Sequence, residues 1–128
     1  MSIVVGFLAT IEGRAALDEA IAQARQHGDP LFVVVSLRAG ATPELEAETV
    51  AALASTVGLA GIEHEVRVLR GGDVADDILG VAEEVEARLV VLGLRRRSRV
   101  GKLILGANAQ RVLFDAPCPV LTVKPGAT

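Results

Sequence analysis

Three short runs of apolar residues in the chain show no alternation with polar residues and are rich in β-branched side chains. They span residues 2–8, 31–37 and 89–93. Uninterrupted runs of this length are typical of strands that are covered on both faces within a parallel sheet. The sequence therefore predicts at least three buried parallel strands.

Helical periodicity separates these runs. Apolar residues recur at spacings of three and four over residues 16–24, and Gly28 is placed to end that helix. A weaker apolar stripe covers residues 45–57, and a clear apolar face over residues 74–85 follows Asp73, which is a suitable N-cap. Strands and helices therefore alternate along the chain, as in α/β proteins.

Two further strands have the character of sheet edges. Over residues 62–69 apolar and charged side chains alternate, which favours a strand exposed on one face. Over residues 116–124, Pro117 and Pro119 cannot donate hydrogen bonds to a neighbouring strand. With the third and fifth strands at the edges, the sequence predicts an open, doubly wound, parallel five-stranded sheet of order 3-2-1-4-5, with helices on both faces.

Sheets of this order bind ligands beyond the carboxyl ends of the strands, where the winding reverses between the first and fourth strands. The loops that follow Leu8 and Gly93 are therefore the expected site. The second loop is basic, because five of the eight residues from Arg95 to Lys102 are Arg or Lys. The formal net charge of the chain is −3, so the remaining residues sum to −3 − 5 = −8 and the positive charge is local.

Composition narrows the function classes. The length of 128 residues is typical of one domain, residues 1–128. The acidic background argues against a nucleic-acid partner. Aromatic residues make up only 2% of the chain, with no Trp or Tyr, so the rings on which single-stranded nucleic acid stacks its bases are also missing. No apolar run approaches the ~20 residues of a membrane span, so no membrane partner is expected. The single cysteine, Cys118, excludes an internal disulfide and favours a cytoplasmic location.

The sequence lacks the residues that several common kinds of functional site require. The Gly-Lys pair at Gly101 and Lys102 is not part of a complete phosphate-binding P-loop motif, and no Gly-x-Gly-x-x-Gly follows the first strand. His27, His64 and Cys118 are too few and too scattered for a metal site. Ser98 has no candidate general base near it in sequence, so no catalytic residue is assigned and an enzyme such as a nucleotide hydrolase is the least favoured interpretation.

The spacing of Gly93, Arg96, Gly106 and Ala107 resembles the universal stress protein signature G-x2-G-x9-G-[S/T]. The following segment, NAQRVLFDAPCPVLTVK, is similar to the C-terminal part of that family, and IVVGFLATIEGRAAL resembles its opening strand and turn. The resemblance implies a five-stranded open sheet, frequent homodimers, a stress or regulatory role and, in one branch, an ATP site.

Three positions depart from the ATP-binding branch that the chain resembles. Leu8 stands where those proteins have Asp, Arg96 replaces the second glycine, and Ala107 replaces the final Ser or Thr. The basic loop offers charge-assisted contacts to phosphate in their place. The candidate ligand-binding residues are Leu8, Ala9, Thr10, Gly93, Arg95, Arg96, Arg97, Ser98, Gly101, Lys102, Gly106, Ala107 and Asn108.

These observations leave two main hypotheses open. One is a stress-response or regulatory protein that binds ATP, another adenine nucleotide or another phosphorylated ligand, with Mg²⁺ only as part of the bound nucleotide. The other is an interaction module of the same fold with no ligand, whose basic loop is solvated or meets an acidic partner that the sequence does not identify. In both, an exposed final strand favours a homodimer formed through Val120, Leu121, Thr122 and Val123.

Overall fold

A computed structural model describes residues 1–7, 11–37, 41–70, 72–96, 103–104 and 106–125. Five parallel strands form one sheet in the order β3-β2-β1-β4-β7. They are β1 (Ser2–Phe7), β2 (Leu31–Leu37), β3 (His64–Arg70), β4 (Ala87–Gly93) and β7 (Val120–Val123). Counting only these five strands, the order is the predicted 3-2-1-4-5, so the predicted fold class is confirmed.

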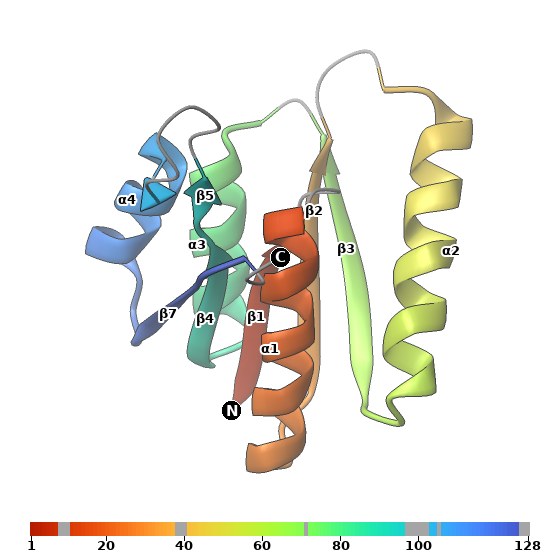
Figure 1. The fold of residues 1–128 in the computed structure, drawn as a ribbon, viewed down its shortest axis with the longest axis horizontal. Coiled ribbons are helices and arrows are strands. Elements are labelled where there is room, and N and C mark those ends of the chain that lie inside the picture. Colours follow the sequence, from red (N-terminus) through yellow and green to blue (C-terminus); the bar gives the residue numbers. More distant parts are fainter. Residues whose placement is uncertain (8–10, 38–40, 71, 97–102, 105, 126–128) are drawn as a thin grey trace.

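Helices cover both faces of the sheet (Figure 1). They are α1 (Ile11–His27), α2 (Pro43–Leu59), α3 (Val74–Glu84) and α4 (Ala107–Asp115). Side chains of α1 and α2 pack on one face of the sheet, and side chains of α3 and α4 pack on the other. The central strand β1 is buried from both sides, which explains why its sequence shows no polar alternation.

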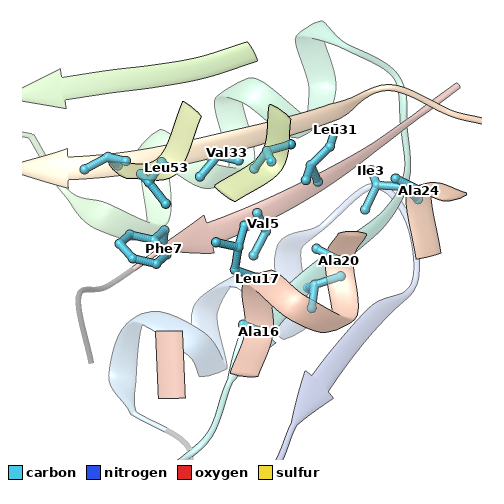
Figure 2. Packing of buried hydrophobic residues seen from close by; sticks show 13 residues of the cluster. Ile3, Val5, Phe7, Ala16, Leu17, Ala20, Ala24, Leu31, Val33 and Leu53 are labelled. Carbon is cyan, nitrogen blue, oxygen red and sulfur yellow. The ribbon is translucent and has the colours of Figure 1, made fainter. Parts of the chain in front are cut away.

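The core between α1 and the sheet consists mainly of small and branched side chains, together with the aromatic ring of Phe7 (Figure 2). Ala16, Ala20 and Ala24 recur every four residues along α1 and are buried, which allows the helix to lie close to the sheet. Leu17 fills the space beside Val5 in the same cluster. This helix therefore depends on packing, and single truncations here would leave cavities.

Two helices begin at side-chain caps, of which the one at Asp73 was predicted. The Asp73 carboxylate accepts a hydrogen bond from the Asp76 backbone N–H at 3.1 Å and caps α3. The Thr42 hydroxyl caps α2 in the same manner, accepting from the Leu45 N–H at 3.1 Å. Gly28, just after α1, has φ of 69°, a left-handed conformation that glycine adopts without a Cβ penalty.

The structure differs from the sequence prediction in several details. The third strand covers His64–Arg70 rather than residues 62–69, and the fourth begins at Ala87 rather than at residue 89. The last strand begins at Val120 rather than at residue 116, because Pro117 and Pro119 cannot donate to β4. A short antiparallel pair, β5 (Arg95–Arg96) and β6 (Leu103–Ile104), lies between β4 and α4 and was not predicted. Strands of two residues leave no periodic signal in a sequence, which is why this pair escaped detection.

Candidate functional site

A cavity of about 410 Å³ lies at the carboxyl ends of the central strands. Its size falls in the range of small-molecule sites. It opens between the sheet, the start of α3 and the start of α4, at the edge that is uppermost in Figure 1. The lining residues in the described part of the chain are Gly6, Phe7, Gly13, Val34, Ser36, Val74, Ile78, Leu92, Gly93, Gly106, Ala107, Asn108 and Ala109.

One wall of the cavity is apolar and tightly packed. It combines Val34 and Leu92 from the sheet with Ile78 from α3. Gly6 lets these side chains meet, because a Cβ at that position would lie 2.7 Å from Ile78 Cδ1 and 3.3 Å from Leu92 Cδ2. Any larger residue would force Ile78 to shift, so Gly6 is needed for the packing of this wall.

The start of α4 forms the opposite wall and is open. Gly106 is the N-cap residue, with φ of −65° and ψ of 164°, and it has no side chain with which to accept the first-turn N–H groups of the helix. A Cβ added at Gly106 would meet nothing within 4 Å. The fold therefore does not require glycine here, whereas close approach of an anion to the backbone would.

Ion pairs of Arg111 link α4 to α3. Its guanidinium donates to the Asp73 carboxylate at 3.2 Å and also to the Asp76 carboxylate, and it lies 3.8 Å from Asp115 on its own helix. The hydrogen bond to Asp76 raises the pKa of Arg111 above its ordinary value. Asp73 is also the cap of α3, so one arginine in the middle of α4 joins that helix to the start of α3.

At the end of β2, a pair of polar side chains borders the cavity. The Ser36 hydroxyl, which lines the cavity, donates a hydrogen bond to Asp77 Oδ2 on α3 at 3.0 Å. Both side chains are half-buried. A polar group thus interrupts an otherwise apolar end of the cavity.

Comparisons with known proteins identify the family to which the chain belongs. A sequence profile of the universal stress protein family matches residues 1–124. The universal stress protein of Mycolicibacterium smegmatis is 35% identical in an alignment that covers 96% of this chain and 97% of that protein. The chain belongs to the universal stress protein family.

Solved structures of the universal stress protein family agree with the fold. A universal stress protein from Archaeoglobus fulgidus matches with a TM-score of 0.81 and 37% identity, over 97% of this chain and 98% of that one. A structure of the universal stress protein from the same organism in complex with dAMP matches with a TM-score of 0.78 and 32% identity, with the same coverage. Some mycobacterial family members are longer, and this chain spans 47% of their length.

In this member of the universal stress protein family, four of the predicted site residues meet at the cavity. Gly93 ends β4, and Gly106, Ala107 and Asn108 begin α4. The backbone of Arg95 and Arg96 forms β5, directly after β4. The other predicted ligand-binding residues lie outside the described part of the chain: Leu8, Ala9, Thr10, Arg97, Ser98, Gly101 and Lys102.

Sequence reasoning missed the apolar wall and the polar pair. Gly6 and Ser36 sit inside runs that read as plain buried strands, yet each is the one residue of its run that breaks the apolar pattern near the carboxyl end. That interruption was the signal in the sequence that could have identified these two residues as cavity residues. Ile78 was correctly predicted to face the core, but nothing in its helical spacing could indicate that it also borders a cavity.

The described residues lack two kinds of feature. They contain no group of three or more His, Cys, Asp or Glu side chains that could hold a metal ion. None of the described helices has the length and apolar character needed to cross a membrane.

Proposed function

We propose that this universal stress protein binds an adenine nucleotide in the cavity at the carboxyl ends of β1, β2 and β4, and acts as a ligand-controlled regulatory protein. The phosphate lies at the start of α4, against Gly106, Ala107 and Asn108, and the base lies against the apolar wall. No catalytic residue is part of the proposal, and Mg²⁺ enters only with a nucleotide. We place this function in one domain, residues 1–128, in the cytoplasm.

The observation that carries the proposal is the uncapped start of α4 facing the cavity. Gly106 offers no side chain to the first-turn N–H groups, and a Cβ there would have open space. Helix N-termini attract phosphate because their free N–H groups donate hydrogen bonds and the helix dipole favours negative charge. The apolar Val34, Val74 and Ile78 supply a complementary surface for a base.

A relative supports the choice of ligand. The Archaeoglobus fulgidus protein with 32% identity was solved in complex with dAMP, an adenine nucleotide with a single phosphate. A cavity of about 410 Å³ has the size expected for a ligand of that class.

Charge near the predicted site supports an anionic ligand as well. Between β5 and β6 the sequence carries Arg97, Arg99 and Lys102, and β5 itself contains Arg95 and Arg96. We propose that this basic segment, together with Ser98 and Gly101, supplies the phosphate contacts that Ala107 lacks. Leu8, Ala9 and Thr10, which follow β1, complete the proposed site.

Equilibrium dialysis against adenosine monophosphate and against ATP with Mg²⁺ tests this function. Nucleotide is read at 260 nm, where a protein without Trp or Tyr absorbs little. We expect retained nucleotide and a higher melting temperature, because a ligand that binds only the folded state stabilises it. The absence of both effects at millimolar nucleotide would refute ligand binding and leave an interaction module.

The free edge of β7 favours a second, compatible function as a homodimer. In the described sheet β7 pairs with β4 on one side only, and Val120, Leu121, Thr122 and Val123 are all half-buried. Phe114 at the end of α4 is 80% exposed. We propose that β7 pairs with its copy about a twofold axis, which would satisfy the free backbone groups. A monomeric mass in light scattering at micromolar concentration would contradict this.

A further inference from the structure

The Ser36 hydroxyl at the cavity has a fixed hydrogen-bond direction. A free serine hydroxyl can donate one hydrogen bond and accept two. Here the Ser36 proton points to Asp77 Oδ2 at 3.0 Å, and an ionised carboxylate can only accept. Ser36 therefore presents only acceptor lone pairs to a ligand in the cavity.

The two polar regions of the cavity have opposite hydrogen-bonding character. The start of α4 presents backbone N–H donors beside Gly106. The end of β2 presents an acceptor at Ser36, supported by the negative charge of Asp77. A matching ligand has an anion at one end and a hydrogen-bond donor at the other.

From this polarity we infer that the Ser36–Asp77 pair determines base specificity, by selecting ligands whose base carries an amine donor. The inference rests on the proposed nucleotide function. Adenine carries an exocyclic amine that can donate to Ser36 Oγ. A purine without that amine leaves the acceptor lone pairs of Ser36 Oγ without a donor in a half-buried position, which costs binding free energy.

Asp77 acts as a positioning residue. It is not among the residues that line the cavity, and its effect on a ligand passes through the direction of the Ser36 hydroxyl. An Asn at position 77 can donate its amide N–H to Ser36 Oγ, which frees the hydroxyl proton to point into the cavity. Asp77→Asn should therefore relax the selection without removing the hydroxyl.

The test compares two probes, adenosine monophosphate and purine riboside monophosphate, which differ only in the exocyclic amine. Their dissociation constants are measured by titration calorimetry with the full chain. For the unsubstituted protein we expect a preference for adenosine monophosphate of about tenfold, the usual worth of one unpaired polar group in a partly buried site. Because the readout is a ratio measured on one preparation, a lower folded fraction in a variant does not alter it.

Three variants complete the test. Ser36→Ala should reduce the preference to less than about twofold, because it removes the acceptor. Asp77→Asn should give an intermediate preference. Glu83→Gln removes an exposed carboxylate from the same helix, away from the cavity lining, and should keep the full preference.

The outcomes separate this inference from the proposed function. Loss of the preference in Ser36→Ala and its weakening in Asp77→Asn, with Glu83→Gln unchanged, would support the assignment. Equal binding of the two probes to the unsubstituted protein, or a preference that survives in Ser36→Ala, would overturn it while leaving nucleotide binding in place. If neither probe binds the unsubstituted protein, both the nucleotide function and the specificity role fail.

Discussion

The two ends of the parallel sheet are built differently. At the amino ends of the strands, backbone hydrogen bonds extend the pairing of neighbouring strands: the Ile3 N–H donates to the Pro30 carbonyl at 3.0 Å and the Leu31 N–H to the Glu63 carbonyl at 2.9 Å. At the carboxyl ends, the described chain surrounds a cavity and leaves the start of α4 without a side-chain cap. One end stabilises the fold, and the other presents a helix start of the kind that anionic ligands bind.

The contrast extends to single polar side chains. Ser2, at the amino end, is 2% exposed, and its hydroxyl donates to the Val85 carbonyl at 2.8 Å. Ser36, at the carboxyl end, donates to Asp77 but still faces the cavity. Both hydroxyls are used as donors, yet only the second leaves lone pairs that a ligand can reach. The same residue type therefore serves the fold at one end of the sheet and recognition at the other.

The largest expected effect comes from adding a methyl group to the packed wall of the cavity. Gly6→Ala places a methyl group 2.7 Å from Ile78 Cδ1. Overpacking of this kind costs about 1–3 kcal/mol in the free energy of unfolding. Urea denaturation should show the loss as a lower midpoint with an unchanged slope.

Ile78→Val provides the matched test of that prediction, since it deletes the Cδ1 atom that the new methyl group meets. In this background Gly6→Ala should cost clearly less, so the two substitutions should not be additive. Additive costs would mean that Gly6 is required for another reason.

The second effect separates affinity from stability. Gly106→Ala adds a methyl group where the fold leaves open space, so the free energy of unfolding should change by less than about 0.5 kcal/mol, since a weaker N-cap and a less flexible unfolded chain offset each other. Affinity for adenosine monophosphate should fall about tenfold or more, because even one charge-assisted hydrogen bond contributes about 1.5–3 kcal/mol. Dialysis and thermal denaturation measure the two quantities.

Gly80→Ala is the control for this substitution. Gly80 is exposed within α3 and a Cβ there also meets nothing within 4 Å. It should stabilise the protein by about 0.5–1 kcal/mol without altering affinity. Unchanged affinity in Gly106→Ala would argue against phosphate at the start of α4.

The third effect lies at the amino end. Ser2→Ala leaves the Val85 carbonyl without its buried donor and should reduce the free energy of unfolding by about 1 kcal/mol. Nucleotide affinity should not change, because the two ends of the sheet serve separate purposes. Ser55→Ala, on the exposed side of α2, should leave stability nearly unchanged. A loss of affinity in Ser2→Ala would weaken the contrast between the ends.

The smallest effect is a pH dependence, also at the amino end. The hydrogen bond from Arg88 Nε, at 2.7 Å, lowers the pKa of Asp29 below its ordinary value of 3.8. Since the folded state favours the charged form, the resulting stability is present above pH 3.8 and is lost as the pH falls through the lowered pKa. Arg88 is 40% exposed, so the contribution should stay below about 1 kcal/mol.

Asp29→Asn removes this titrating group. Its free energy of unfolding should fall less steeply than that of the unsubstituted protein when the pH is lowered from about 5 to about 2. Urea denaturation at a series of pH values measures the slope. Parallel curves for the two proteins would show that the ion pair contributes nothing to acid sensitivity.

Much of the architecture could be predicted because burial determines the local pattern of apolar residues. The runs that became β1, β2 and β4 and the stripe that became α3 were readable, since a strand covered on both faces must be apolar throughout and a helix on a sheet must be apolar on one side. The edge position of β7 was predicted from Pro117 and Pro119, which precede the strand. The short β5 and β6 strands were not, because two residues contain no period.

The sequence alone determined the fold class, the strand order and the glycines of the signature, because these follow from local patterns of burial and from spacing. The tertiary structure alone decided which residues share the cavity. Gly6, Ser36, Ile78 and Gly106 come from four different elements and are far apart in the chain. The direction of the Ser36 hydroxyl was likewise decided by Asp77, 41 residues away. Such contacts depend on how helices dock on the sheet, which no local pattern encodes.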